Sequence, residues 1–280
     1  RKIGQALGAR YVLEGSVRRD NGHIRVTAQL IDAHNGYHLW SKTFDRPIGD
    51  VLAVQEDIAS AVAESLQVTL DGESKIQLAA RRPVKMDSYE LYLLGRHYQL
   101  QRTPESMVKA VEYQQQAVAA DPRFALAYAG LADAHMATFY YSNRPFSEVE
   151  RAIEPLLAKG LEINPRLPEL YTARAVLRTE QWQLESAEQD LKRAIALNPN
   201  YADAYVRLGA SYEYAGRPRD ALSAYSKAQE LDPLHFILHT RRCLTYQNLG
   251  RYTEAAAGGD RAGSLAVAGS SDRRWCGARG

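Results

Sequence analysis

The sequence lacks the features that mark secreted scaffolds and membrane proteins. It has only two cysteines, Cys243 and Cys276, in 280 residues, which is too few for a disulfide framework. It contains no run of 18 apolar residues, so it offers no candidate for a transmembrane helix. Its first residues show no secretory signal pattern. These absences do not decide the compartment, because a chain without disulfides can function on either side of a membrane.

A surplus of charge of one sign is also missing. The formal net charge is +2, and charged residues make up 24% of the chain, so nothing in the balance favours binding to nucleic acid or to a membrane surface. No Gly-rich phosphate loop, GxSxG motif or HExxH motif occurs. Carboxylate pairs such as Glu56-Asp57 fall on faces where solvated side chains are expected. The sequence therefore predicts no catalytic residues, no metal site and no cofactor.

What the chain does contain is a repeat. An acidic or amide residue precedes proline at Asp121-Pro122, Asn164-Pro165, Asn198-Pro199 and Asp232-Pro233. The last two intervals are both 34 residues, and the first is nine residues longer. Proline can end one helix and begin the next, because it cannot donate a hydrogen bond in a helix interior but is tolerated in a first turn. The spacing predicts a series of helical hairpins.

The most regular copy is "ADAYVRLGASYEYAGRPRDALSAYSKAQELDP". It resembles the tetratricopeptide repeat, whose pattern is W-x2-L-G-x2-Y, then A-x3-F, then P, with tyrosine here in place of tryptophan and phenylalanine. The preceding copy has Arg174 where leucine is usual. Small residues such as Gly209 and Ala221 are expected to let paired helices approach closely, and several hairpins must stack to bury their apolar faces. The predicted repeats span 88–122, 125–165, 168–199, 202–233 and 236–267.

Three of these copies depart from the pattern. The first carries extra residues around "QRTPES" and the second around "FYYSNRPFSEVE", which are expected to lengthen loops. In the fifth copy, Gly259 replaces the aromatic residue expected in the second helix, and glycine costs about 1 kcal/mol there relative to alanine. We predict that the array, 88–262, ends near Ala262 and that residues 263–280 form a disordered or aberrant tail.

The segment before the repeats has a period of two instead. Asn21-Gly22 and Asn35-Gly36 each lie between β-prone runs, which is the strongest short signal for a hairpin. We expect strands near 10–19, 23–33 and 37–45, with alternate residues of the middle strand buried. Asp50 is predicted to cap a helix that runs to about Leu70. The fold class expected is thus a truncated α+β unit, an antiparallel meander plus a helix, followed by an all-α superhelix.

Within residues 1–70, the stretches "ALGARYVLEGSVRR", "RVTAQLIDAHNGYHLWSKTFDR" and "DVLAVQEDIA" resemble the TolB amino-terminal-like domain of bacterial signalling proteins. In that family a strand and a helix precede this point, so the resemblance implies a partial domain and a chain that is a fragment. Residues 71–87 are expected to be a linker to the array. The resemblance also implies an effector elsewhere in the protein: a class III nucleotide cyclase, a protein kinase or a winged-helix DNA-binding domain. A purely structural scaffold is a further alternative, and self-association is possible.

In a tetratricopeptide superhelix, the first helix of each repeat lines a concave groove that receives a peptide or protein partner. The lysine-asparagine clamp that binds a chaperone's terminal carboxylate in some members is missing, because Ala129, Asp133, Thr172, Val176, Val206 and Ala210 occupy its positions. The groove is predicted to present Asp133, Glu169, Thr172, Val176, Asp203, Arg207, Glu213, Arg241 and Gln247. The strongest candidates for partner contacts are Asp133, Thr172, Arg207, Glu213, Arg241 and Gln247.

One further pattern suggests a metal site. His235, His239 and Cys243 lie four residues apart, so they share a helix face, and histidine and cysteine are zinc ligands. The repeat register aligns them with Tyr201, Tyr205 and Gly209, which is a packing pattern of aromatic, aromatic and small residues. No fourth ligand is apparent, so we expect packing rather than metal binding.

Overall fold

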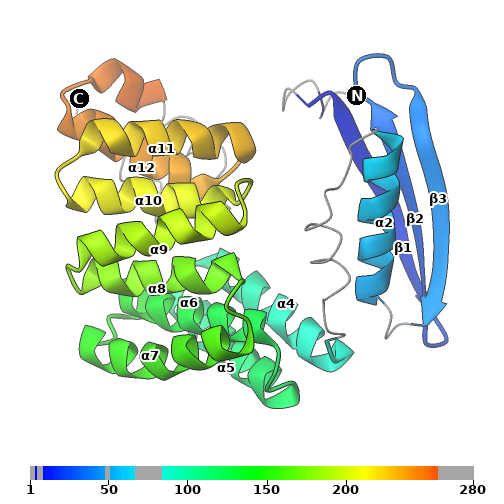
Figure 1. Cartoon of the computed structure of the whole chain (residues 1–280), viewed down its shortest axis with the longest axis horizontal. Helices are drawn as coiled ribbons and strands as arrows, with labels where there is room; N and C mark the ends of the chain where they lie inside the picture. Colours follow the sequence, from blue (N-terminus) through cyan, green and yellow to red (C-terminus); the bar gives the residue numbers. More distant parts are fainter. Residues whose placement is uncertain (1–3, 5–8, 48–50, 67–83, 258–280) are drawn as a thin grey trace. The chain divides into compact units, whose positions relative to one another are not determined.

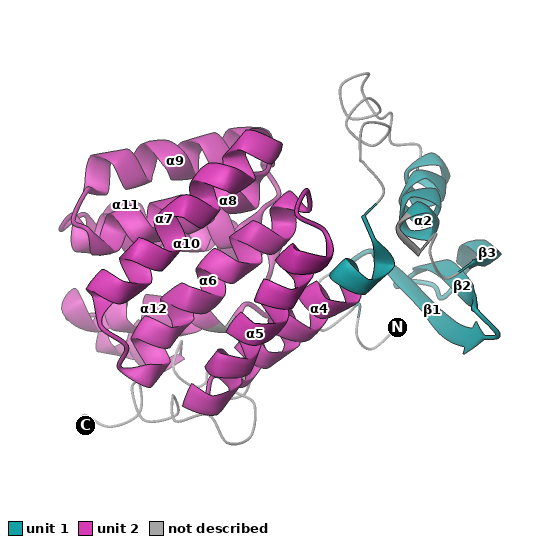
Figure 2. Cartoon of the chain, turned by 90° about the horizontal axis from the view of Figure 1, so that it is seen from below, with its two compact units in different colours: residues 1–89 teal, residues 90–280 magenta. Residues whose placement is uncertain are grey.

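The computed structural model describes residues 4, 9–47, 51–66 and 84–257. It divides into two compact units, residues 1–89 and 90–280 (Figure 2). The first unit contains a small sheet and a helix, and the second is a stack of helices (Figure 1). The predicted order of a β-rich segment followed by a helical array is confirmed. The predicted tail, 263–280, most of the predicted linker, 71–83, and Asp50 lie outside the described residues.

The sheet consists of β1 (Tyr11–Asp20), β2 (His23–Asp32) and β3 (His38–Pro47), paired antiparallel in the order β1-β2-β3. Asn21 and Gly22 both have positive φ, at 45° and 80°, as a two-residue type I′ hairpin requires. The second connection is longer. Asp32 Oδ1 accepts hydrogen bonds from the backbone N–H groups of His34 and Asn35, and Gly36 has φ 82°. The meander predicted from the two Asn-Gly pairs is therefore present.

Helix α2 (Val51–Ser65) packs on one face of this sheet, against β2 and β3. Ile24, Ala28 and Leu30, the alternate residues expected inside, are buried. Phe44 of β3 and Val54 of α2 are buried with them. On the same face of β1, Leu13 and Val17 remain 50% and 66% exposed, so the burial is concentrated on β2 and β3.

The helical unit is a series of antiparallel pairs, which we call repeats 1 to 5. The first helices of these repeats, the A helices, are α4 (Met86–Gln101), α6 (Ala125–Ser142), α8 (Pro168–Glu180), α10 (Ala202–Tyr214) and α12 (Phe236–Asn248). The second, or B, helices of repeats 1 to 4 are α5 (Pro104–Ala120), α7 (Phe146–Ile163), α9 (Leu184–Leu197) and α11 (Pro218–Leu231). Residues 252–257 begin the second helix of repeat 5. Among the described residues, no helix is both long enough and apolar enough to cross a membrane.

The residue before each proline ends a B helix and begins the turn that leads to the next A helix. Asp121, Asn164, Asn198 and Asp232 are the C-cap residues of α5, α7, α9 and α11. In each, the side-chain oxygen accepts a hydrogen bond from the backbone N–H two residues further on. Such a turn needs a short side chain with an acceptor, which explains why only aspartate and asparagine occupy this position.

A second hydrogen bond is repeated near the start of the A helices. Tyr128, Tyr171 and Tyr205 donate their hydroxyls to the carbonyl oxygens of Pro122, Pro165 and Pro199, at 3.0, 2.8 and 3.2 Å. In repeat 5, His239 Nε2 makes the same contact with the Pro233 carbonyl at 2.8 Å. The bond links an A helix to the loop before it, and it gives the polar end of each ring a partner.

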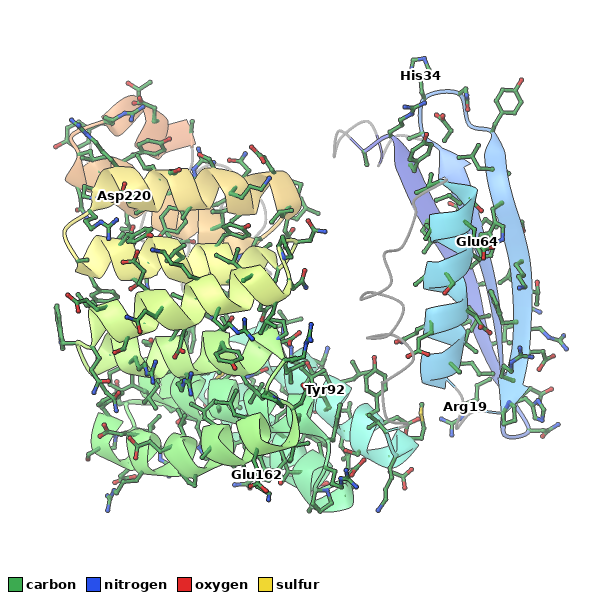
Figure 3. The ribbon with its side chains drawn as sticks, in the orientation of Figure 1. Arg19, His34, Glu64, Tyr92, Glu162 and Asp220 are labelled. Carbon is green, nitrogen blue, oxygen red and sulfur yellow. The ribbon has the colours of Figure 1, made fainter. Side chains whose placement is uncertain are left out.

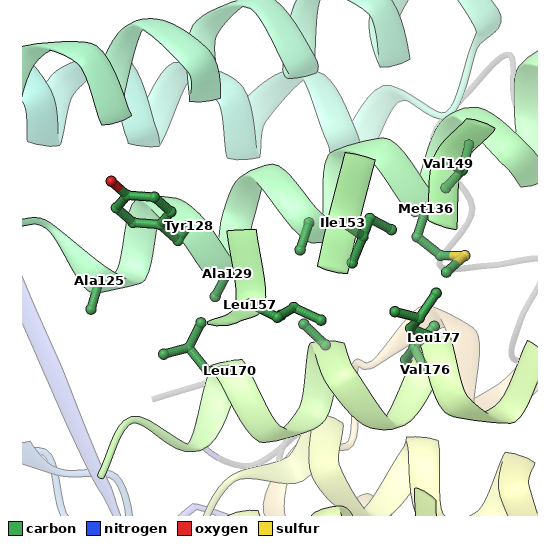
Figure 4. Packing of buried hydrophobic residues seen from close by; sticks show 12 residues of the cluster. Ala125, Tyr128, Ala129, Met136, Val149, Ile153, Leu157, Leu170, Val176 and Leu177 are labelled. Carbon is green, nitrogen blue, oxygen red and sulfur yellow. The ribbon is translucent and has the colours of Figure 1, made fainter. Parts of the chain in front are cut away.

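The core of the array lies between neighbouring hairpins. Tyr128, Ile153, Leu157 and Leu170 pack together where α6, α7 and α8 meet (Figure 4). Within repeat 4, a Cβ on Gly209 would lie 2.3 Å from Tyr225 Cε1, so only glycine leaves room for that buried ring. The role predicted for Gly209, close approach of paired helices, is confirmed.

The extra residues of repeats 1 and 2 were predicted to lengthen loops, and this is wrong: they lengthen the helices. Helices α6 and α7 each have 18 residues, whereas α8 and α10 have 13, and the turn between α6 and α7 spans only 143–145. Helical residues satisfy their own backbone hydrogen bonds, so extended helices accommodate the insertion without a long loop.

Candidate functional site

A groove with a cavity volume of about 700 Å³ runs along the A helices. Its lining comes from all five of them and from the loops that enter α10 and α12. The polar and charged members are Arg96, Gln99, Arg102, Asp133, Tyr140, Tyr141, Tyr201, Asp203, Arg207, Asp232 and His235. The apolar members include Leu100, Met136, Ala137 and Val176. The groove is therefore a mixed polar and aromatic surface built from segments far apart in the sequence.

The centre of the groove is a cluster of opposite charges. Arg207 Nε lies 3.4 Å from Asp203 Oδ1, and His235 Nε2 lies 3.5 Å from the same oxygen. The Leu238 backbone N–H donates to His235 Nδ1, which places the ring proton on Nε2, facing Asp203. Burial opposes ionisation of Asp203, but Arg207 and His235 outweigh it and lower the pKa of that carboxyl. Asp203 is thus a carboxylate that is already paired with Arg207 and His235 within the protein.

Asp133 is held differently. Its nearest cation is Arg96, with Nη1 4.0 Å from Oδ2, and the Asp133 side chain is 31% exposed. Burial raises the pKa of Asp133 to about 6, an effect that Arg207 and Arg96 reduce and that Asp203 and Glu169 increase. A carboxylate whose charge is poorly compensated favours a cation or a hydrogen-bond donor from a ligand.

Of the six strongest candidates for partner contacts, Asp133 and Arg207 line the groove. Glu213 and Arg241 contact each other between repeats 4 and 5, with Arg241 Nη1 3.3 Å from Glu213 Oε2. The Thr245 hydroxyl also donates to Glu213 Oε1. These two candidates therefore already satisfy much of each other's charge within the protein.

Thr172 and Gln247 do not line this groove. Thr172 is buried, at 3% exposure, and its hydroxyl donates to the Pro168 carbonyl at 3.1 Å. Its polar atom is thus directed to its own helix. Gln247 is partly exposed on α12.

The helix face that carries His235, His239 and Cys243 is used for packing and capping. His235 is the N-cap of α12, and His239 is 2% exposed and bonded to the Pro233 carbonyl. Cys243 is completely buried. Among the described residues, no group of three or more histidine, cysteine, aspartate or glutamate side chains could hold a metal ion.

The sequence reasoning missed a group of aromatic residues at one end of the groove. The Tyr140 hydroxyl donates to Glu180 Oε1 at 2.6 Å, and Trp182 meets Tyr214 edge to face with ring centroids 5.8 Å apart. The repeat register contained a signal. Trp182 precedes Gly216 by 34 residues, and Gly216 precedes Gly250 by 34, so tryptophan occupies the position that is glycine in the next two repeats.

Comparisons with known proteins agree with the architecture of the helical unit. Residues 202–234 match the family model "Tetratricopeptide repeat". A crystal structure of a thermophilic TPR protein from Thermus thermophilus superposes with a TM-score of 0.55 and 20% identity, covering 66% of this chain and 95% of that one. Residues 202–234 thus match a tetratricopeptide repeat in sequence, and the helical unit has a tetratricopeptide-like superhelical fold.

Two curated relatives align with parts of the chain. One, from Rhizobium meliloti, is named "Putative adenylate cyclase 3" and is 37% identical over 131 residues, 47% of this chain and 22% of the relative. The other is small glutamine-rich tetratricopeptide repeat-containing protein 2 of Mycosarcoma maydis, 36% identical over 80 residues, 29% of this chain and 23% of the relative. The chain therefore spans less than a quarter of the length of either relative.

Proposed function

We propose that the array is a non-catalytic binding module that holds an extended segment of a protein partner in the groove along the A helices. The observation that supports this most directly is the groove itself, about 700 Å³ in volume. The five A helices and their loops together line it with aromatic, apolar and charged side chains. A site that combines apolar area with a few placed polar groups suits an extended peptide, because its backbone amides and its side chains both need partners.

The charges at the centre indicate how the segment would be held. Asp203 is paired with Arg207 and with His235, so the three side chains form a preorganised polar surface at the centre of the groove. Asp133 has one distant cation partner and can accept hydrogen bonds from a ligand. Preorganised groups of this kind reduce the entropic cost of binding.

The experiment is a selection of random displayed peptides on the purified chain, followed by affinity measurements on the selected peptides. Ala137 lines the groove and is partly exposed, so Ala137→Gln adds neutral bulk there while retaining good helix propensity. We expect at least a tenfold loss of affinity, with helical circular dichroism unchanged. Ala257→Gln, on an exposed residue outside the groove lining, is the control. Equal affinities for the wild type and Ala137→Gln would contradict the proposal.

We further propose that the chain is a regulatory part of a bacterial signalling protein. The support is the likeness to the Rhizobium protein and the resemblance of residues 1–70 to the TolB amino-terminal-like domain. On this reading catalysis would belong to another part of the protein. The purified chain should then form no cyclic AMP from ATP with Mg²⁺ or Mn²⁺, and formation of cyclic AMP would show that the chain itself is a cyclase. The gene sequence upstream of Arg1 distinguishes a cyclase from a kinase or a winged-helix regulator.

A further inference from the structure

Four side chains gather where three successive A helices end, and we call them the aromatic end site: Tyr140, Glu180, Trp182 and Tyr214. Tyr140 lies near the end of α6, Glu180 is the last residue of α8, and Tyr214 is the last residue of α10. Tyr140 lines the groove and bonds to Glu180, so the site is continuous with the groove. Tyr140, Trp182 and Tyr214 are 45%, 70% and 37% exposed, although tyrosine and tryptophan are large and mostly apolar.

Trp182 adopts a backbone conformation that disfavours its own side chain. Its φ is 59°, in the left-handed region, whereas Gly216 and Gly250 have φ of 69° and 70° at the equivalent turns. A non-glycine residue with this conformation costs free energy, and such positions concentrate at functional sites. The indole lies at the surface, where it packs edge to face on Tyr214 rather than in the core.

The surroundings of these rings favour positive charge. Glu180 contributes a carboxylate next to Tyr140, and the Tyr140 hydroxyl occupies only its Oε1 in the described contacts. The C-terminal ends of α6, α8 and α10 each carry partial negative charge from their last carbonyl groups, and this charge is felt within the last turn. The faces of tryptophan and tyrosine rings also attract cations, because the ring quadrupole is negative there.

The arginines near the site already have carboxylate partners. Arg178, in the last turn of α8, is paired with Asp190. Arg207 is paired with Asp203, and Arg241 is paired with Glu213. Arg207 affects the ionisation of Tyr140, and Arg241 interacts directly with Tyr214, so both lie within electrostatic range of the site. In the described contacts none of these arginines pairs with Glu180, whose carboxylate and the nearby helix ends supply negative charge at the aromatic end site.

We propose that the aromatic end site binds a lysine or arginine side chain of the segment held in the groove, with the cation next to Glu180 and against the rings of Trp182 and Tyr214. This inference rests on the proposed function, and it specifies the chemistry of the partner: a basic residue at the end of the segment that leaves the groove beside α6, α8 and α10.

The test uses the full chain with Trp40→Phe and Trp275→Phe, so that Trp182 is the only indole. The probes are acetylated, amidated hexalysine and hexaglutamate, titrated at constant ionic strength while the emission of Trp182 is recorded. We expect a saturable change with hexalysine and none with hexaglutamate. Glu180→Gln and Tyr214→Leu should each raise the Kd for hexalysine at least fivefold.

The matched control is Glu162→Gln, which removes a carboxylate from the outer face of α7, where the side chain is 69% exposed (Figure 3). It should leave the Kd for hexalysine within twofold of the parent value. Equal losses in Glu180→Gln and Glu162→Gln would show non-specific attraction and overturn the proposal, as would binding of hexaglutamate with similar affinity. Unchanged affinity in Glu180→Gln would also overturn it.

The peptides selected by display separate this proposal from the proposed function. If they contain lysine or arginine and lose affinity in both Ala137→Gln and Glu180→Gln, both proposals are supported. If they lose affinity only in Ala137→Gln, the groove binds peptides and the cation site is wrong. If neither substitution changes their affinity, both proposals are wrong.

Discussion

Arg174 of α8 and Asp190 of α9 form a two-hydrogen-bond ion pair inside repeat 3, with Nε–Oδ2 and Nη2–Oδ1 distances of 2.8 and 2.6 Å. Arg178 Nη1 donates to the same carboxylate at 2.7 Å. The Asp190 side chain is only 6% exposed. The arginine that stands in place of the usual leucine is therefore accommodated by an aspartate on the partner helix.

This pair predicts unequal costs for removing its two members. Asp190→Ala leaves two guanidinium groups without their carboxylate and should lower the free energy of unfolding by about 3 kcal/mol. Arg174→Leu should cost less, because Arg178 still neutralises Asp190 and leucine is the residue found here as Leu131 and Leu208. Urea denaturation followed by circular dichroism measures both. A greater cost for Arg174→Leu than for Asp190→Ala would contradict this account.

The hydrogen bonds from A-helix tyrosines to prolyl carbonyls predict a smaller effect that depends on burial. Tyr128 is 7% exposed, so Tyr128→Phe leaves the Pro122 carbonyl without this donor in a buried setting and should cost about 1 kcal/mol. Tyr171→Phe removes the same bond at a solvent-exposed position, where water can replace it. Tyr171→Phe should therefore lower the free energy of unfolding by clearly less than Tyr128→Phe. Equal losses in the free energy of unfolding for the two variants, measured by urea denaturation, would mean that the contribution of this bond does not depend on burial.

The contact of Gly209 with Tyr225 predicts that a destabilising substitution at one of these residues can be compensated by a substitution at the other. Gly209→Ala places a methyl group against the buried ring and should destabilise the array by about 1–3 kcal/mol, despite the better helix propensity of alanine. In repeat 3 the equivalent residues are Ala175 and Leu191, both buried in the same cluster. Adding Tyr225→Leu to Gly209→Ala should therefore recover most of the loss. Additive losses in the double variant would show that the two residues are not coupled.

These elements show what the sequence could and could not reveal. The hairpin turns at Asn21-Gly22 and the helix boundaries at each Asx-Pro pair were predictable, because both depend on local backbone chemistry. From the sequence, the groove could be predicted only as a set of positions on the A helices, without the contacts that their side chains make. Whether Glu213 faces a partner or pairs with Arg241 depends on side-chain contacts between repeats, which the period does not specify. The pairing of Asp190 with Arg174 lies within repeat 3, but it too depends on side-chain contacts between two helices that the period does not specify.

Asp133 predicts a pH dependence of stability with a defined sign. Its pKa rises from an ordinary value of 3.8 to about 6 in the folded chain, so the folded state binds the proton more tightly than the unfolded state. Its contribution to stability is therefore full below about pH 3.8 and is lost as the pH rises through 6. Asp133→Asn should be more stable than the wild type at pH 7.5, by about 1 kcal/mol after allowing for its partial exposure, and not at pH 4.

Thermal unfolding at both pH values measures the Asp133 effect, and Asp220→Asn, on the exposed outer face of α11 (Figure 3), is the control. The control variant should show no such gain at pH 7.5. A stability difference for Asp133→Asn that is the same at pH 4 and pH 7.5 would mean that the carboxyl is not perturbed.

Trp182 predicts a conflict between stability and binding. Trp182→Gly restores the residue that repeats 4 and 5 have at this turn, and it removes the strain of a φ of 59°. The array should gain about 1 kcal/mol in its free energy of unfolding, because the ring is 70% exposed and little burial is lost. The same substitution removes one face of the aromatic end site, so affinity for basic peptides should fall at least fivefold. Urea denaturation and peptide titration on one preparation measure both effects. A variant that binds as well as the wild type would show that the strained tryptophan serves only the fold, and a variant that is less stable would show that its packing on Tyr214 outweighs the strain.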